Sequence, residues 1–326
     1  MNEALLFHPV ARDDGLGELP IAAHLMAHDL VLWRDASGAV HAAADRCPHR
    51  GAALSLGRVR GDTLECAYHG WRFDARGQCV AVPALPAFVP PASHKACAYS
   101  ARVAYGLIWV ALTAQPESTV PAFAAEHDAR LRKLLCGPYE VATGAPRLIE
   151  NFLDMSHFAF VHEGLLGDRA HASVEPHTIE FTADGFIATG CKAWQPQSTL
   201  QATDGAMIDY TYEVGSPYSC VLTKRAETAP DTEREAIAIF VCPLAPERSR
   251  VWIRLALIDR EASDASLRDF QDTIFRQDQP VLESQRPRLL PITADAPVTE
   301  LHSAADRSSA AYRRCLRERG ITFGVC

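Results

Sequence analysis

The sequence predicts an α+β protein of two domains, an all-β N-terminal domain followed by an antiparallel sheet packed by helices. Short apolar runs separated by tight turns fill the first third of the chain, whereas the rest combines alternating strands with two helical stretches. The chain has 326 residues, more than the roughly 250 to 300 at which a single hydrophobic core stops growing. Two domains are therefore expected.

The first predicted domain spans residues 1–112. A hairpin is expected in "LVLWRDASGAVHAAA", where Asp-Ala-Ser-Gly separates two apolar runs, and a second in "WRFDARGQCVAVPA" around Ala-Arg-Gly. The segment "YGLIWVAL" is typical of a buried strand. Residues 113–147 are richer in proline and polar side chains, so we expect a linker there, with one short helix near residues 123–135.

The second predicted domain spans residues 148–326. Apolar side chains recur at helical spacing in "RLIENFLDMSHFAFVHEGLL", from Leu148 to Ala159. Residues 172–260 alternate between apolar and polar in the manner of strands, and a closing helix is expected over residues 264–286. This pattern indicates an antiparallel sheet with helices packed on it.

Charge and composition exclude several classes of partner. The formal net charge is −8 and no run of basic residues offsets it, so we expect neither a nucleic acid nor a membrane as partner. The arginines between residues 313 and 319 lie at helical spacing and are interpreted as a solvated face. No apolar run approaches the length of a membrane span, and the N-terminus lacks the pattern of a signal peptide, so a cytoplasmic location is expected. The ten cysteines have no disulfide-framework spacing.

Two cysteines and two histidines lie close together in "RCPHRGAALSLGRVRGDTLECAYHGWRF", residues 46–73. They form the pattern C-x-H followed by C-x-x-H. One tetrahedral zinc could be held by such a set, but zinc sites usually begin with C-x2-C or end with H-x3-5-H. In a Rieske [2Fe–2S] centre two Cys bind one iron and two His the other, so each loop supplies one of each kind. Taken singly, each of the four fits an unrelated core Cys or surface His equally well.

The two motifs "CPHRG" and "CAYHGW" resemble those of the Rieske proteins, including Gly51 and Gly70, which let backbone amides approach the cluster sulfurs. Respiratory members carry a further Cys in each loop, at positions occupied here by Ala52 and Tyr68. The stretch "YHGWRFD", with Tyr68 and Trp71, is similar to the bacterial oxygenase type instead. The resemblance implies a [2Fe–2S] cluster held by Cys47, His49, Cys66 and His69.

A second candidate metal site lies in "ENFLDMSHFAFVHEG", which contains His157 and His162, preceded by Asn151 and Asp154. Non-haem Fe(II) oxygenases bind their iron through two His and one carboxylate on one face. The i, i+5 spacing does not place both His on one face of a regular helix, so a π-type bulge or a break is expected between them. Taken alone, two such His are more often core or surface groups than ligands.

The chain as a whole resembles the Rieske non-haem iron oxygenases, in the branch of N- and O-demethylating monooxygenases of methylxanthines, dicamba and vanillate. That family has N-x-x-D-x-x-H-x4-H in this relative place and takes a carboxylate ligand from a late helix, which "FRQDQPVLESQRP" supplies as Asp278. Asp272 and Glu283 lie on the same helix and are the alternatives. The resemblance implies a helix-grip (START-like) second domain and a mononuclear Fe(II) held by His157, His162 and Asp278. Catalytic roles fall to Asp154 and Asn151.

The same resemblance implies partners and an assembly. We expect a homotrimer in which Asp154 bridges His69 of one subunit and His157 of the next, so that electrons pass between subunits. We also expect a separate NAD(P)H-dependent reductase of flavin and ferredoxin type, because the chain has no Gly-rich dinucleotide fingerprint and no plant-type four-cysteine loop. The expected reaction uses O2 to hydroxylate or oxidatively demethylate a small organic substrate, aromatic or heterocyclic, as in the catabolism of aromatic compounds.

Two other functions remain open from the sequence alone. A Rieske-type electron carrier needs only residues 46–73, and a ligand-binding module could enclose a ligand between a curved sheet and a long helix. The second domain's sheet offers aromatic side chains that are candidates for a substrate pocket, although aromatic residues are as readily buried in a core. They are Trp194, Tyr210, Tyr212, Phe240 and Trp252.

Overall fold

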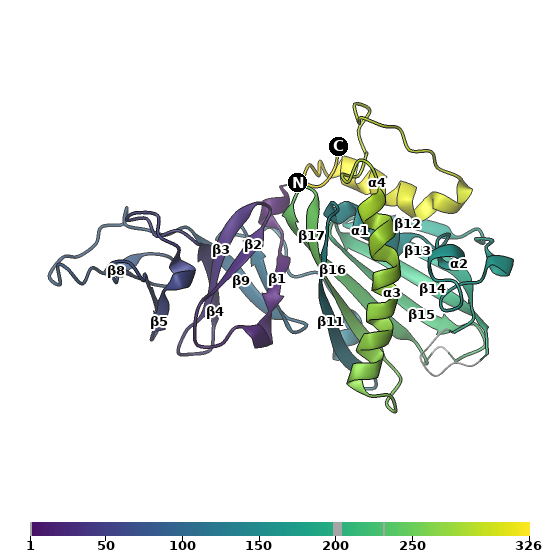
Figure 1. Ribbon diagram of the computed structural model, residues 1–326, viewed down its shortest axis with the longest axis horizontal. Coiled ribbons are helices and arrows are strands. Elements are labelled where there is room, and N and C mark those ends of the chain that lie inside the picture. Colours follow the sequence, from purple (N-terminus) through teal and green to yellow (C-terminus); the bar gives the residue numbers. More distant parts are fainter. Residues whose placement is uncertain (1, 198–203, 231) are drawn as a thin grey trace. The chain divides into compact units, whose positions relative to one another are not determined.

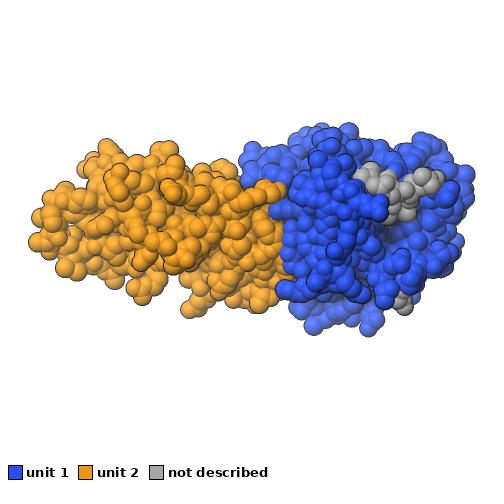
Figure 2. Space-filling model, turned by 90° about the horizontal axis from the view of Figure 1, so that it is seen from below, with its two compact units in different colours: residues 1, 121–326 blue, residues 2–120 orange. Residues whose placement is uncertain are grey.

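The computed structural model describes residues 2–197, 204–230 and 232–326 and has the predicted α+β class. The chain divides into two compact units, residues 2–120 and residues 121–326 together with residue 1 (Figure 2). Among the described residues, the first unit contains strands and single turns of 3-10 helix, whereas the second combines one large antiparallel sheet with four α-helices.

Ten strands form two antiparallel sheets in the first unit. The six-stranded sheet has the order β1-β10-β9-β4-β3-β2 and the four-stranded sheet the order β5-β6-β7-β8. The strands are β1 His8–Arg12, β2 Ile21–Leu25, β3 His28–Arg34, β4 Val40–Ala44, β5 Arg58–Arg60, β6 Thr63–Glu65, β7 Arg72–Phe73, β8 Cys79–Ala81, β9 Ala98–Ala104 and β10 Leu107–Ala111. The 3-10 turns are η1 Glu3–Leu5, η2 Asp13–Gly15 and η3 Leu54–Leu56.

Both predicted hairpins of the first unit are confirmed. Strands β3 and β4 pair on either side of the Asp-Ala-Ser-Gly turn, and β7 pairs with β8. In the first turn, the carboxylate of Asp35 accepts hydrogen bonds from the backbone amides of Ser37 and Ala39 and from the Ser37 hydroxyl. The short polar side chain thereby replaces backbone partners that the turn cannot supply. The predicted buried strand is β10, all five residues of which are buried.

In the part of the second unit that the structure describes, seven strands form the sheet, in the order β11-β17-β16-β15-β14-β13-β12, with every neighbouring pair antiparallel. They are β11 Arg132–Val141, β12 Thr178–Thr182, β13 Gly185–Gln195, β14 Ala206–Ser216, β15 Ser219–Ala226, β16 Glu235–Ala245 and β17 Arg248–Leu257. The helices are α1 Ala145–Leu153, α2 Phe158–Val161, α3 Asp264–Ser284 and α4 Arg307–Glu318, with 3-10 turns η4 Ala124–His127, η5 Arg169–His171 and η6 Ala304–Asp306.

Helix α3 runs across one face of this sheet (Figure 1). It begins with the side chain of Ser263 accepting a hydrogen bond from the backbone amide of Ser266, which is a common N-cap. The expected helix over residues 264–286 is thus confirmed, and it ends two residues earlier. Helix α1 packs on β15 and β16.

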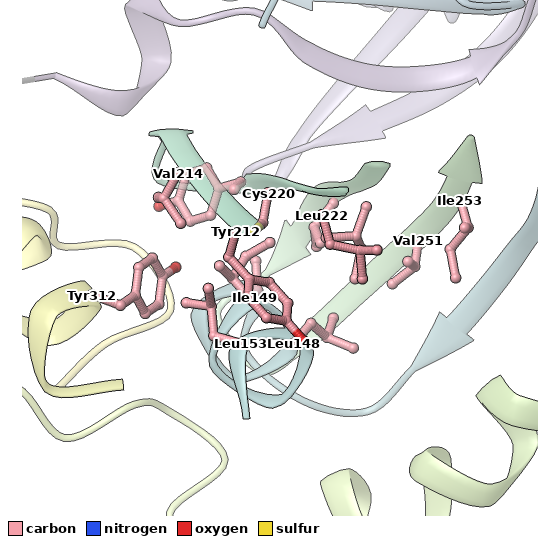
Figure 3. Close-up of a cluster of buried hydrophobic side chains, with 14 of the residues drawn as sticks. Leu148, Ile149, Leu153, Tyr212, Val214, Cys220, Leu222, Val251, Ile253 and Tyr312 are labelled. Carbon is pink, nitrogen blue, oxygen red and sulfur yellow. The ribbon is translucent and has the colours of Figure 1, made fainter. Parts of the chain in front are cut away.

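The core of the second unit lies between the sheet and helices α1 and α4. Figure 3 shows Tyr212, Leu222 and Ile253 from three strands gathered with Ile149 of α1 and Tyr312 of α4. Each of these side chains is less than a tenth exposed. Their removal from water is the main stabilising contribution of this unit, since each buried side chain of this kind adds about 1.5 to 3 kcal/mol.

The predicted linker over residues 113–147 does not match the structure. Its expected helix is only the single turn η4, and its later part is β11, the edge strand of the large sheet. The sequence "CGPY" in this strand suggests a loop, because proline lacks the backbone donor that a strand needs. The register of β11 on β17 shifts between Cys136 and Tyr139, and this irregularity on an edge strand accommodates Pro138.

The predicted helix around Leu148 to Ala159 is broken into two. Helix α1 ends at Leu153, and Asp154 has extended backbone with φ −84° and ψ 127°. Helix α2 is a single turn that begins after His157. The spacing of the apolar residues suggested that Asp154 and His157 lie on one helix. The structure shows that they do not.

The interpretation of the late arginines as a solvated face is wrong for Arg313. This side chain on α4 is 6% exposed and forms a two-bond ion pair with Glu150 of α1, plus a hydrogen bond to Glu300. Its guanidinium also donates to the carbonyl oxygen of Pro291. Arg313 therefore joins α4, α1 and the segment before η6.

The remaining expectations of the sequence concern cysteines and membranes. Eight of the ten cysteines are buried, as expected for small core side chains. Within the ranges that the structure describes, no helix is both long and apolar enough to cross a membrane.

Replacing Arg313 with Met should lower the free energy of unfolding by about 1.5 to 3 kcal/mol, because the partly buried carboxylates of Glu150 and Glu300 lose one of their two arginine partners and keep Arg147. The matched control is Arg314→Met, which removes an exposed pair with Glu318 on the same helix and an exposed cation–π contact with Phe181. The control should leave the free energy of unfolding nearly unchanged. Urea denaturation followed by circular dichroism measures both; equal effects of the two substitutions would contradict the structural role of Arg313.

Candidate metal centres

Two loops of the first unit, at residues 47–52 and 66–71, have the same backbone hydrogen bonds. In each loop the backbone amide of the cysteine donates a hydrogen bond to the carbonyl oxygen five residues later. The backbone amide of the glycine four residues after the cysteine donates a hydrogen bond to the carbonyl oxygen of that cysteine. The bonds run from Cys47 to Ala52, Gly51 to Cys47, Cys66 to Trp71 and Gly70 to Cys66, with N···O distances of 2.8, 2.8, 2.9 and 3.0 Å. The two loops are thus equivalent turns that present equivalent side chains.

Both turns require glycine. Gly51 and Gly70 have φ values of +75° and +71°, a region that other residues rarely adopt. A Cβ atom at Gly70 would also lie 3.0 Å from Cγ of Pro83. Glycine is therefore favoured at both positions by the backbone of the turn, while its role in bringing amides close to the sulfurs stays a prediction.

The two cysteines of these loops lie inside the unit and the two histidines outside. Cys47 and Cys66 are 2% exposed, whereas His49 and His69 are exposed, with ring centroids 4.7 Å apart. Burial raises the pKa of the Cys47 thiol to about 11, although the backbone amides of His49 and Arg50, which hydrogen-bond to it, oppose the rise. Two inner thiols and two outer imidazoles fit a [2Fe–2S] cluster of mixed ligation better than one tetrahedral ion.

Aromatic rings pack against both candidate histidines. The indole of Trp71 stacks on His49 with centroids 4.4 Å apart and an interplanar angle of 4°, and His94 stacks against Trp71 at 5.5 Å. Tyr68, 61% exposed, lies 3.8 Å from the ring of His69. The sequence pointed to Tyr68 and Trp71, but His94 was missed because it lies more than twenty residues from either motif.

His157, His162 and Asp278 bring three donor atoms together in the second unit. The Nε2 atoms of the two histidines are 3.2 Å apart, and Oδ1 of Asp278 is 3.4 Å from one and 3.2 Å from the other. Three donor atoms that each lie about 2.1 Å from one ion, in directions at right angles to one another, are about 3.0 Å apart. The three atoms thus form one face of an octahedron, the arrangement of the 2-His-1-carboxylate sites.

The short helix α2 explains how His157 and His162 meet despite their i, i+5 spacing. His157 is the residue before α2 and His162 the residue after it, with φ −109° and ψ 30°. The expected π-bulge is absent from α2, and the break lies before His157 instead. Asp278 comes from the later half of α3. The site therefore joins segments that are more than a hundred residues apart.

Each candidate histidine has a partner on its other ring nitrogen. Nδ1 of His157 lies 3.3 Å from Oδ2 of Asp154, and Nδ1 of His162 lies 2.8 Å from Oε1 of Gln277. Such partners fix which nitrogen faces the metal. Sequence reasoning missed Gln277, although its place directly before Asp278 on the same helix was a signal.

The pKa values of this site follow from the same contacts. Burial raises the pKa of Asp154, but hydrogen bonds from His157 and Ser156 outweigh burial, and the pKa lies below its ordinary value. Burial lowers the pKa of His162, but the carboxylate of Asp278 outweighs burial and the pKa is raised. A metal cation would take the place of the proton that the Asp278 carboxylate favours on His162.

The two alternative carboxylates of α3 are engaged elsewhere. Asp272 accepts a hydrogen bond from the Tyr139 hydroxyl, and Glu283 accepts one from the backbone amide of Ala142. Asp278 instead faces both histidines and also lies 3.4 Å from the side-chain amide of Asn151. Among the three acids, the geometry therefore favours Asp278.

A cavity in the second unit begins at these three donor atoms. The space that its wall atoms delimit, open mouth included, measures about 790 Å³. Most of its walls are apolar. They include Phe152, Leu222, Ile237, Ile253 and Phe275.

Of the five aromatic pocket candidates, Tyr210 lines this cavity. Tyr212, Phe240 and Trp252 are each at most 1% exposed and do not line it. Trp194 lies at a separate small hollow. The alternative interpretation of these side chains, as core, thus applies to most of them.

Residues 7–98 match the Rieske [2Fe–2S] domain, and residues 141–320 match the vanillate O-demethylase oxygenase C-terminal domain. The chain belongs to the Rieske non-haem iron oxygenases. It is 34% identical to the methylxanthine N1-demethylase NdmA of Pseudomonas putida over 96% of this chain and 88% of the relative. It is 31% identical to the methylxanthine N3-demethylase NdmB of the same organism, over 97% of this chain and 89% of the relative. The structure of Pseudomonas putida CBB5 NdmA with caffeine superimposes with a TM-score of 0.85, 32% identity, and coverage of 97% and 90%.

Membership in this family settles the class of enzyme. This oxygenase is an oxidoreductase with a Rieske [2Fe–2S] cluster and a mononuclear iron as cofactors. It is a terminal oxygenase that uses O2 and electrons from a reductase to hydroxylate or oxidatively demethylate a small aromatic or heterocyclic compound. The expected branch, that of the N- and O-demethylating enzymes, is confirmed.

Replacing Gln277 with Leu should weaken iron binding by the second unit about 10- to 100-fold, because His162 loses the acceptor that orients its ring. The matched control is Gln279→Leu on the same helix, whose amide bonds Glu283 and the carbonyl oxygen of Glu140. Competition with an Fe(II) chelator measures the affinity, and the absorbance of the [2Fe–2S] cluster should not change. Equal iron affinity in both variants would contradict the orienting role of Gln277.

Proposed function

We propose that this oxygenase removes a methyl group from a nitrogen or oxygen atom of a small aromatic or heterocyclic compound held in the apolar cavity. The observation that carries the proposal is the triangle of donor atoms at the wall of that cavity, since a substrate bound there lies next to the iron. Relatives 31–34% identical act as methylxanthine demethylases, which favours an N-methylated heterocycle.

We assign His157, His162 and Asp278 to the iron, and Cys47, His49, Cys66 and His69 to the [2Fe–2S] cluster. When bound, the iron supplies activation of O2 for attack on a C–H bond, and the cluster supplies electrons one at a time. By the same assignment, residues 2–120 form the electron-transfer domain and residues 121–326 the catalytic domain.

The chain's own groups position the substrate and the ligands. The apolar walls hold a flat ring and exclude water from the oxidising site. Gln277 orients His162, and Asn151 donates from its amide to Asp278, so both ligands keep one direction. Once a methyl group on nitrogen or oxygen is hydroxylated, the product breaks down to formaldehyde and the demethylated compound.

We also propose a homotrimer, a cytoplasmic location and a separate NAD(P)H-dependent reductase of flavin and ferredoxin type. In the trimer, Asp154 carries electrons from His69 of one subunit to His157 of the next. The contact of Asp154 with Nδ1 of His157 supports this role, because one carboxylate oxygen faces the ligand and the carboxylate has lone pairs for a further donor. The exposure of His69 leaves it accessible to a neighbour.

The two alternative functions lack support from these observations. The function of an electron carrier does not explain the triangle of metal-binding donors beside a cavity. A ligand-binding module has no use for the paired loops of the first unit. Both alternatives also require that the chain consume no O2.

Replacing Asp278 with Ala should reduce the iron content from three to two per chain and abolish formaldehyde release, because the mononuclear site loses its anionic ligand. The cluster spectrum should stay unchanged. Asp272→Ala, on the same helix but bonded to Tyr139, is the control and should keep three irons. Elemental analysis and formaldehyde assays with N-methylxanthines and methoxybenzoates measure these outcomes. Three irons and full activity in Asp278→Ala would rule out this ligand and make Glu283 the next candidate.

Co-expressing Cys66→Ala chains, which lack the cluster, with Asp278→Ala chains, which lack the mononuclear iron, should yield mixed oligomers that recover part of the wild-type rate. Recovery is expected because some cluster-bearing chains lie beside iron-bearing neighbours. Adding Asp154→Ala to both chains should abolish the recovery. Mixed oligomers that are folded, contain both metals and remain inactive would exclude transfer between subunits.

A further inference from the structure

A row of polar side chains crosses the otherwise apolar face of the large sheet that lines the cavity. In the sheet register, Lys224 of β15 lies opposite Tyr210 of β14 and opposite Glu235 of β16. The next row on this face pairs Leu222 with Tyr212 and with Ile237. An ammonium group in such a wall is unusual, because its burial costs free energy unless it has a partner.

Lys224 lies away from the metal triad. Besides the main cavity, it lines a smaller hollow shared with Gln271 and Leu267 of α3 that includes none of the three candidate iron ligands. Gln271 precedes Asp278 by two helical turns, about 10 Å along the axis. A small ring system can therefore place a methyl group at the triad and a polar atom near Lys224.

Glu235 fixes and balances the charge of Lys224. Its Oε2 atom lies 3.6 Å from the Lys224 ammonium, and its Oε1 atom accepts a hydrogen bond from the backbone amide of Ile258. Both side chains are nearly buried, at 13% and 11% exposed. The pair is therefore held in place with no net charge.

A second donor lies beside the ammonium. The hydroxyl oxygen of Tyr210 accepts a hydrogen bond from the side-chain amide of Gln195, so the hydroxyl proton is available to an acceptor in the cavity. Tyr210 is 3% exposed and lines the cavity wall. Lys224 and Tyr210, directly opposite each other in the register, are thus two donors that line the same cavity.

We propose that Lys224 is a specificity-determining residue that binds a neutral carbonyl oxygen of the substrate, with Tyr210 as a second donor and Glu235 as the positioning residue. The substrate is then an uncharged methylated ring compound with a carbonyl group on the side away from the methyl group that is removed. This inference rests on the proposed function, because it places that methyl group at the metal triad.

A carboxylate in the same place is disfavoured by charge. Glu235 already balances Lys224, so an anionic ligand would add an uncompensated negative charge to apolar walls. The smaller hollow is also lined by Asp259, whose Oδ2 atom is buried and has no hydrogen-bond partner among the described residues. A neutral acceptor receives the hydrogen bond without this cost.

The test compares two probes of the same shape, 4-methoxybenzamide and 4-methoxybenzoate, by their dissociation constants for the metal-loaded enzyme. Wild-type enzyme should bind the amide at least tenfold more tightly than the benzoate. Lys224→Met should weaken amide binding about tenfold or more, whereas Lys224→Arg should keep it within about threefold. In Glu235→Gln, the preference for the amide over the benzoate, measured as the ratio of the two dissociation constants, should fall at least tenfold. A merely structural role of Glu235 would not produce this change. Tyr210→Phe should weaken amide binding several-fold.

Lys192→Met is the control, because it removes an exposed lysine pair with Glu227 outside the cavity and should change neither constant. An unchanged ratio in folded Lys224→Met and Glu235→Gln proteins, or binding of neither probe to wild type at millimolar concentration, would overturn the proposal. Formaldehyde release separates this failure from that of the proposed function. If formaldehyde is released but the ratio of the two dissociation constants is unchanged in the variants, only the role of Lys224 is rejected. If the ratio shifts as expected but no methylated compound yields formaldehyde, the role of Lys224 is supported and demethylation is rejected.

Discussion

The second unit depends on holding three electron-pair donors within 3.2–3.4 Å of one another, on His157, His162 and Asp278. Lone pairs at this distance repel unless a proton or a metal ion lies between them. Much of the local structure serves this contact. The break after α1 places His157 at the start of a single helical turn, and the 21 residues of α3 extend far enough to bring Asp278 beside it.

The first unit separates its ligands by their contact with water. Cys47 and Cys66 lie in the core, where backbone amides can approach the sulfurs, whereas His49 and His69 lie at the surface. An electron can therefore leave through the imidazole side without the sulfurs meeting solvent. This arrangement suits a domain that exchanges electrons with a partner.

The features predicted correctly from the sequence are local. The loops around Cys47 and Cys66 depend on bonds within five residues, and the hairpin at Asp35 and helix α3 follow from turn chemistry and periodicity. The features missed depend on distant contacts. The strand β11 exists because β17 pairs with it, and Arg313 is buried because Glu150 and Glu300 approach from other segments. The contacts of Gln277 with His162 and of Glu235 with Lys224 likewise join residues of different elements, which no local pattern brings together.

The central claim is that the cluster of the first unit feeds electrons to oxidation chemistry at the triad of the second. A single-turnover experiment tests it most directly. The cluster is reduced without O2, the reductant is removed, and O2 is added with and without a methylated substrate. We expect that substrate accelerates the return of the oxidised cluster spectrum and that demethylated product forms in the same phase without any reductase. Reoxidation at one rate in both cases, with no product, would contradict it.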